Sequence, residues 1–278
     1  MNKSLLYLVV GILILGGVYY LTSGKPVTQS HRSYELSLTS KPTNVTPGQP
    51  ATISYSIKND KGEILKNYEV VHEKIMHFIV VRKDLHYFQH IHPTFNQSTG
   101  QFTIDVTFPT DGIYRVFPDF TPGKSQDNPL LLPVTLFQDV EIGSLGKYTA
   151  QTVAPDTTTK KSVGAYDITH IFPKQEELKA QKNVTFSLVV NKNGQPVTDL
   201  ENYLGALGHS VILAAGNLDF IHTHPKADSG DHGEHMMQET GPQIDFATSF
   251  PVPGTYKIFT QFQHQGKVIT VDYAILVN

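Results

Sequence analysis

Hydrophobic and polar residues alternate with a period of two along much of the chain after residue 25, a pattern typical of half-buried β-strands. Short runs rich in Val, Ile, Tyr, Phe and Thr are separated by turn residues, and helical periodicity is almost absent. Seven strands in about 110 residues are what an immunoglobulin-like sandwich requires. The predicted strands of the first such unit span residues 34–38, 51–58, 76–82, 87–92, 101–108, 113–120 and 130–142.

The same unit occurs twice in the sequence. Residues 76–93 align without a gap to residues 208–225 at an offset of 132, and both segments end in His-x-His-Pro. Residues 108–117 align with residues 250–259 at an offset of 142, so the second copy holds ten extra residues between the two blocks. Such self-similarity predicts two tandem domains of one fold.

A tyrosine follows a Gly-x pair at the same place in each copy. Tyr114 and Tyr256 resemble the tyrosine corner of immunoglobulin-like domains, in which the hydroxyl returns to the backbone. The expected fold is therefore all-β, with two tandem immunoglobulin-like β-sandwich domains after a single N-terminal transmembrane helix. The expected boundaries are an anchor at residues 1–24, a stalk at 25–33, a first domain at 34–143, a linker at 144–164 and a second domain at 165–278.

The N-terminus indicates where the protein is located. Residues 5–21 carry no charge, and Lys3 and Lys25 flank them. The run is at the boundary between a signal-peptide core of about 7–15 residues and a membrane span of about 17–25 residues. An uncleaved anchor is the favoured interpretation, and a signal peptide cleaved after Gly24 is the alternative. Either interpretation places the bulk of the chain outside the cytoplasm, held at the cell membrane by a single pass in the favoured case.

Composition narrows the function classes. Charged residues make up 17% of the chain and the net charge is −3, so no basic face for nucleic acid is predicted. The chain has no Cys, which excludes disulfides, thiolate metal sites and thiol catalysis. Motifs such as GxSxG, a Walker loop and HExxH are missing, and we expect no enzyme. The unusual feature is the content of 13 His.

Hairpin geometry predicts where the histidines of each copy meet. If residues 76–82 and 87–92 pair around a four-residue loop, the numbers of each cross-strand pair add up to 169. Alternation then places His77, His90 and His92 on one face of the ribbon. Three neutral imidazoles with an open position are a familiar ligand set for copper or zinc. The second copy places His209, His222 and His224 in the same way, with pair sums of 433.

The same face also has a structural interpretation. Phe88 and Phe220 share the parity of the histidines, so the face is partly a core face. The histidines would then be hydrogen-bonded polar residues at the end of a sandwich. A slip of one residue in register would also separate His77 from the other two.

Further candidate ligands are concentrated in the second copy. His264 lies near the end of a predicted strand and is expected to close a fourth corner of the second site. The second domain would therefore bind metal more tightly than the first. The weaker candidates are His72 in the first copy and His232, His235, Met236 and Met237 in the inserted loop of the second.

The segments around the two His-x-His-Pro blocks carry a family resemblance. Residues 72–93 and 199–225 resemble bacterial extracytoplasmic proteins with an HxHP signature in immunoglobulin-like domains, of the YtkA-like or heavy-metal-binding type. The family pattern L-E-P-Y-L-G-A-x-G-H matches residues 200–209, with Asn202 where Pro is common. The resemblance implies an extracytoplasmic location alongside copper-handling systems.

The sequence as a whole predicts a membrane-anchored, extracytoplasmic metal-binding protein. Copper is the expected ion and zinc the second choice, in a storage, delivery or tolerance role, with the membrane and other copper-handling proteins as partners. A structural or adhesive surface module without metal is the alternative, and a metallohydrolase is a third and less favoured interpretation.

Overall fold

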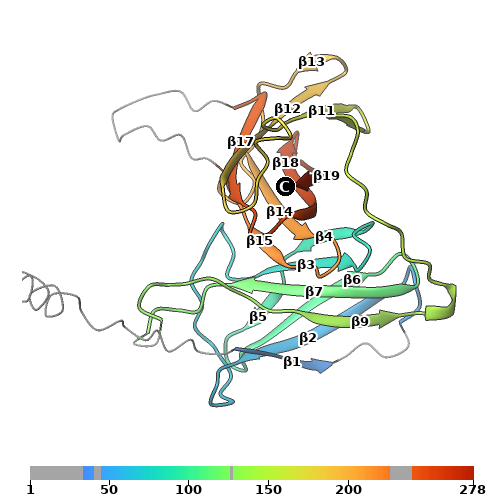
Figure 1. Ribbon diagram of the computed structural model, residues 1–278. Coiled ribbons are helices and arrows are strands. Elements are labelled where there is room, and N and C mark those ends of the chain that lie inside the picture. Colours follow the sequence, from blue (N-terminus) through green and yellow to red (C-terminus); the bar gives the residue numbers. More distant parts are fainter. Residues whose placement is uncertain (1–33, 41–44, 126–127, 226–239) are drawn as a thin grey trace, which may run out of the picture. The chain divides into compact units, whose positions relative to one another are not determined.

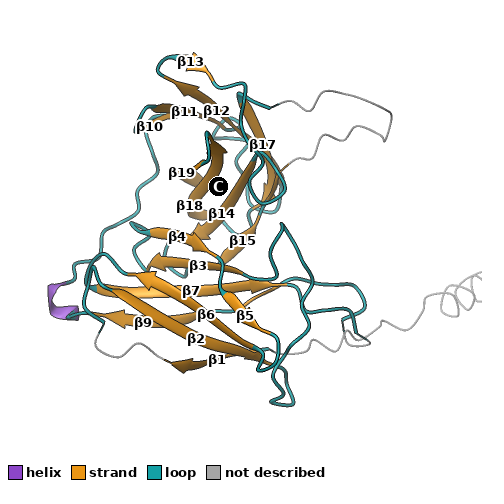
Figure 2. Ribbon diagram, turned by 180° about the vertical axis from the view of Figure 1, so that it is seen from behind, coloured by secondary structure: helices purple, strands orange, loops and turns teal. Residues whose placement is uncertain are grey.

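The computed structural model describes residues 34–40, 45–125, 128–225 and 240–278. The regular structure of these residues is β-strand, joined by loops, apart from one short 3-10 helix, η1 (Leu145–Lys147), among the described residues (Figures 1 and 2). The all-β prediction is confirmed. Residues Tyr34–Asn278 cluster into one compact unit. Within it, the sheets are built separately from an N-terminal half, residues 34–143, and a C-terminal half, residues 160–278.

The N-terminal half forms two antiparallel sheets in the orders β1-β2-β6-β5 and β4-β3-β7-β8, with β9 also paired to β7. Six of the seven predicted strands are found within two residues of their expected ends. The predicted strand at residues 130–142 is two strands instead, β8 and β9, and the short β5 was not predicted. The strands are β1 (Glu35–Ser40), β2 (Pro50–Lys58), β3 (His77–Arg82), β4 (Phe88–Ile91), β5 (Thr94–Asn96), β6 (Gln101–Thr107), β7 (Gly112–Phe120), β8 (Val134–Thr135) and β9 (Gln138–Ile142).

The C-terminal half repeats this plan in the orders β10-β11-β12-β17-β16 and β15-β14-β18-β19, with β13 paired to β12. Strand β10 falls within the predicted linker, residues 144–164. It is part of the C-terminal half, because it pairs with β11 and extends that sheet. The strands are β10 (Lys160–Val163), β11 (Tyr166–Ile171), β12 (Asn183–Lys192), β13 (Gln195–Pro196), β14 (Gly208–Ala214), β15 (Phe220–His222), β16 (His224–Pro225), β17 (Gln243–Ser249), β18 (Gly254–His264) and β19 (Lys267–Val277).

Each half has its own hydrophobic core between its two sheets, as in a β-sandwich. In the N-terminal half Tyr55 of one sheet stacks on Phe78 of the other, with ring centroids 5.2 Å apart. Both tyrosine corners are present. The hydroxyl of Tyr114 donates to the backbone oxygen of Thr110 at 3.1 Å, and that of Tyr256 donates to Val252 at 2.6 Å.

A third hydrophobic cluster joins the two halves. Phe88 stacks on Phe259 with centroids 4.4 Å apart, and Phe117 contacts Phe220 with centroids 5.7 Å apart. The alignment makes Phe88 equivalent to Phe220 and Phe117 equivalent to Phe259, so the two contacts are the same contact with the halves exchanged. Such reciprocity is the mark of a two-fold interface. Other members of the cluster are Ile79, Val81, Leu85, Val211, Leu213 and Leu218.

No helix in the part of the chain that the structure describes is long and apolar enough to cross a membrane. The predicted span, residues 5–21, lies outside the described residues, so the anchor stays a prediction.

Candidate metal centre

The first histidine hairpin has the predicted register. Ile79 pairs with His90 and Val81 pairs with Phe88, so the residue numbers add up to 169. The rings of His77, His90 and His92 come together as expected. Their centroids are 5.2 Å apart for His77 and His90, 5.0 Å for His77 and His92, and 4.8 Å for His90 and His92.

The second hairpin follows its predicted register only in part. Val211 pairs with His222, and the pair sum is 433. The chain then passes to the other sheet, where His224 pairs with Ala247 of β17. The expected ladder pair between His209 and His224 is therefore wrong. The side chains of His222 and His224 lie outside the described residues.

His209 instead joins the histidines of the N-terminal half. Its ring lies parallel to that of His77, with centroids 5.6 Å apart and planes 10° apart, and 5.0 Å from that of His90. One ligand nitrogen from each of His77, His90 and His209 lies within 4.8 Å of the others. Among the described side chains, the candidate site is therefore one that both halves build, and the predicted set of His209 with His222 and His224 stays a prediction.

His72 extends this group from a tight turn. Val71 and Lys74 exchange backbone hydrogen bonds of 2.9 and 3.1 Å, and both central residues, His72 and Glu73, have positive φ angles of 48° and 64°. The turn has the signature of type I′, which glycine or asparagine normally occupies. The ring of His72 lies 5.4 Å from that of His209. We name His72, His77, His90, His92 and His209 the histidine cluster.

Two hydrogen bonds determine which ring nitrogens carry hydrogen. His77 Nε2 lies 3.0 Å from the backbone oxygen of Val71, and His90 Nδ1 lies 2.9 Å from Oε1 of Gln261. Both oxygens only accept, so both nitrogens donate. In a neutral imidazole the other nitrogen then has a bare lone pair. His77 Nδ1 and His90 Nε2 are those nitrogens, and they face each other at 3.0 Å.

Two facing lone pairs make no hydrogen bond with each other and repel each other, and a cation bound by both nitrogens removes that repulsion. His92 Nε2 is also 3.2 Å from His77 Nδ1. Nitrogens that bind one ion at about 2.0–2.1 Å are about 2.9–3.4 Å apart. The distances from His77 Nδ1 to the nitrogens of His90 and His92 therefore suit a shared metal ion.

Burial keeps four members of the cluster neutral. Burial, together with the neighbouring imidazoles, lowers the pKa of His90 to about 3 and that of His92 to about 4. Burial likewise lowers the pKa of His209 well below its usual value. The pKa of His77 is also lowered by burial, with an opposing effect from its bond to Val71 and from the carboxylate of Asp119. Neutral imidazole is the form that binds a metal.

His264 is not part of the cluster. It is buried, its Nδ1 lies 2.8 Å from the hydroxyl of Tyr166, and its Nε2 lies 3.0 Å from the carboxylate of Asp199. Three positions separate it from Gln261 on β18, so the two side chains are on opposite faces of the strand. The prediction that His264 completes a ligand set with His209 is wrong, because alternation directs it away from that residue. The predicted loop ligands His232, His235, Met236 and Met237 lie outside the described residues.

Two partners of the cluster were not found from the sequence. The Val71 carbonyl is a backbone group and leaves no sequence signal. Gln261 is one of many glutamines, but the repeat alignment places it where the first copy has Asp119. The ladders confirm that equivalence, since His77 pairs with Asp119 and His209 pairs with Gln261. A polar residue opposite a histidine in both copies is the signal that identifies this position.

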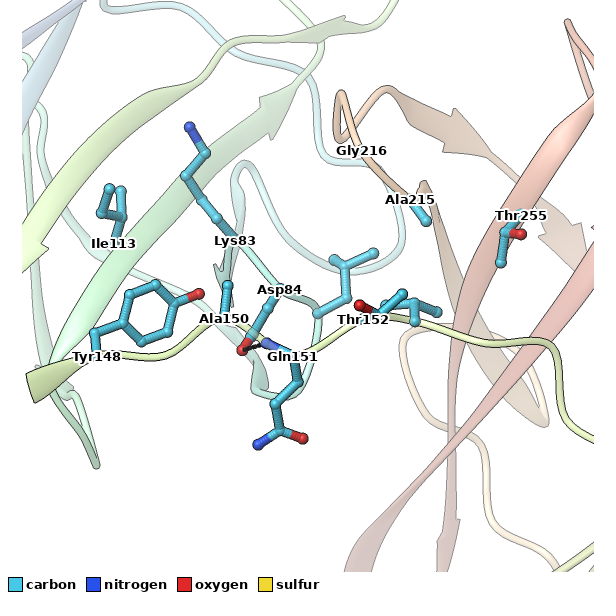
Figure 3. A pocket seen from close by; sticks show the side chains of 12 residues that line it. Lys83, Asp84, Ile113, Tyr148, Ala150, Gln151, Thr152, Ala215, Gly216 and Thr255 are labelled. Carbon is cyan, nitrogen blue, oxygen red and sulfur yellow. Dashed lines mark hydrogen bonds between the residues drawn. The ribbon is translucent and has the colours of Figure 1, made fainter.

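A cavity of about 510 Å³ lies away from the histidine cluster and is lined by residues of both halves and of the segment between them, including Tyr148 and Ala215 (Figure 3). Its buried carboxylate, Asp84, accepts hydrogen bonds from Arg82 Nε at 2.8 Å and from the backbone nitrogen of Gln151 at 3.2 Å. The carboxylate of Asp84 is thus hydrogen-bonded to neighbouring residues, and we assign no chemistry to this cavity.

Comparison with known proteins gives a family but no activity. A family model described as "Domain of unknown function (DUF8832)" matches residues 29–129 and 161–278. No curated protein matches the chain. Among solved structures, a DUF4426 family protein from Pseudomonas aeruginosa PAO1 is similar at 8% identity, over 42% of this chain and 94% of that chain, with a TM-score of 0.31. A likeness this weak carries no argument about fold or function.

Proposed function

This chain belongs to the family described as Domain of unknown function (DUF8832), whose description names no activity, and we propose from its site alone that it binds a transition-metal ion at the histidine cluster. The observation that carries the proposal is the pair of facing lone pairs on His77 Nδ1 and His90 Nε2, 3.0 Å apart. Ligating histidines usually donate their other N–H to a carbonyl or similar acceptor. His77 and His90 both do so, to Val71 and Gln261.

Copper is the ion we propose first, and zinc second. Imidazole nitrogen suits both metals, and Cu(II) binds more tightly than Zn(II) to a given nitrogen site. The chain contains no Cys, so no thiolate competes for the ion. Met76 is buried in the core of the N-terminal half, so no thioether is proposed from it.

The proposed role is to hold or pass on the ion outside the cytoplasm. Both His77 and His90 are buried, with 4% and 7% of their surfaces exposed, which leaves little room for a substrate beside the ion. The location rests on the uncharged run at residues 5–21 and on the resemblance to extracytoplasmic HxHP proteins. We also propose that each half is of the immunoglobulin-like type, since the sheet orders β1-β2-β6-β5 and β4-β3-β7-β9 correspond to strands ABED and C′CFG of that fold.

The test is a titration of purified full-length protein with Cu(II) and with Zn(II), followed by calorimetry and native mass spectrometry. We expect one ion per chain, nitrogen hyperfine structure in the electron paramagnetic resonance spectrum of the Cu(II) form, and an affinity at least tenfold weaker in His77→Ala. His86→Ala is the matched control, because His86 lies in the same hairpin and bonds to the backbone of Asp84. Absence of binding at submillimolar metal would favour the alternative, a structural or adhesive module with hydrogen-bonded histidines.

A further inference from the structure

Gln261 connects the C-terminal half to a histidine of the N-terminal half. It lies on β18, where it pairs with His209, and only 6% of its surface is exposed. Its amide has two partners: Oε1 lies 2.9 Å from His90 Nδ1, and Nε2 donates to Thr270 Oγ1 at 3.0 Å. With the NH2 group directed at Thr270, the amide oxygen faces the ring of His90.

The orientation of this amide determines the tautomer of His90. An oxygen acceptor at Nδ1 requires hydrogen on that nitrogen, and the neutral ring then has its lone pair on Nε2. That lone pair is the one directed at His77 Nδ1, 3.0 Å away. If hydrogen were on Nε2 instead, it would occupy the position where an ion must bind.

The first copy has a different polar residue at the position equivalent to Gln261. The equivalent residue of the first copy is Asp119. Against the effect of burial, its carboxylate raises the pKa of His77 through its charge, and it accepts a hydrogen bond from Thr135 at 2.6 Å. The second copy has an amide in its place. An amide oxygen accepts the N–H of His90 as a carboxylate would, but it adds no charge to the buried cluster.

We propose that Gln261 is a positioning residue of the metal site, through which the C-terminal half selects the metal-binding tautomer of His90 in the N-terminal half. The proposal rests on the metal-binding function proposed above. Gln261 does not itself bind the ion. It makes the Nε2 lone pair of His90 available before the ion arrives, which removes the cost of a tautomer change on binding.

The test compares Gln261→Leu, which removes the acceptor, with Gln261→Glu, which keeps one. The first readout is the ring ¹⁵N spectrum of His90 in metal-free, full-length protein. We expect hydrogen on Nδ1 in the wild type and in Gln261→Glu, and a shift towards Nε2 in Gln261→Leu. The second readout is Cu(II) affinity, which should fall about 10- to 100-fold in Gln261→Leu and be restored to within a few-fold in Gln261→Glu.

Two further variants complete the experiment. Gln263→Leu is the matched control, because Gln263 lies on the same strand but donates to Glu201, and it should change neither readout. If Gln261→Leu does not fold, Thr270→Val frees the amide to rotate and should shift both readouts in the same direction by a smaller amount.

The outcomes separate the two proposals. A wild-type protein that binds no Cu(II) overturns the proposed function, and with it the positioning role. A wild type that binds Cu(II), with a tautomer and an affinity that do not respond to Gln261→Leu, overturns the role of Gln261 alone.

Discussion

His77 and His209 occupy equivalent positions in the two repeats, and their imidazole rings stack with centroids 5.6 Å apart and planes 10° apart. Equivalent residues that touch lie beside the axis relating their two copies. The reciprocal contacts of Phe88 with Phe259 and of Phe117 with Phe220 fit the same axis. The histidine cluster is therefore built where the two repeats meet.

The contribution of His209 tests whether one site spans both halves. We expect His209→Ala and His90→Ala each to weaken Cu(II) binding at least tenfold, because each residue supplies one of the three nitrogens grouped within 4.8 Å. Calorimetry on the full-length variants measures this. Unchanged affinity in His209→Ala would show that the N-terminal hairpin binds the ion alone.

Replacing His264 tests whether this residue is a metal ligand or a structural histidine. We expect His264→Ala to leave the Cu(II) affinity within about twofold of wild type, since its nitrogens bond to Tyr166 and Asp199. The free energy of unfolding should fall by about 1–3 kcal/mol, because the buried hydroxyl of Tyr166 loses its partner. Urea denaturation and calorimetry on one preparation give both values. A large loss of affinity with normal stability would contradict the assignment.

His170 is a buried histidine on β11. Among the described residues, neither of its ring nitrogens has a hydrogen-bond partner, and its ring stacks on Tyr273 with centroids 4.5 Å apart. His170→Phe keeps the stack and removes two unsatisfied nitrogens, so it should stabilise the protein by about 1–3 kcal/mol. Thermal or urea unfolding at pH 7 is the measurement, and a loss of stability would mean that the ring has a polar partner.

Metal-free protein should lose stability as the pH falls from 7 towards 4. The folded-state pKa values are about 3 for His90 and about 4 for His92 and His170, against about 6.5 in an unfolded chain. Between these values the unfolded chain binds more protons, so acid favours unfolding. The neutral rings make their full contribution to the free energy of unfolding above about pH 6.5. This contribution is lost as the pH falls towards the folded-state pKa values.

The size of this effect depends on burial. From pH 7 to pH 5 we expect a loss of about 1–2 kcal/mol for a fully buried imidazole, and less for His92, which is half-buried. Urea unfolding at several pH values measures it. His170→Phe should reduce the loss of stability between pH 7 and pH 5 by the amount that one imidazole contributes. A wild-type stability that does not change over this pH range would refute the burial of these rings.

Local patterns in the sequence were sufficient for six of the seven strands predicted in the first copy and for the first hairpin. Alternation and a four-residue loop specify a register without knowledge of the rest of the molecule, and the pairing of Ile79 with His90 confirms it. The same reasoning placed His77, His90 and His92 on one face. The repeat also predicted both tyrosine corners, since each depends on a tyrosine and a backbone oxygen only four residues before it.

Only the tertiary structure decided where His209 and His264 belong. The outer sheet faces of the two halves meet through Phe88, Phe259 and their equivalents, and the packing of two surfaces far apart in sequence leaves no periodic signal along the chain. That packing brings His209 and Gln261 to the first hairpin. The change of sheet between His222 and His224 is likewise set by the pairing of His224 with Ala247, a contact that alternation within one hairpin does not encode.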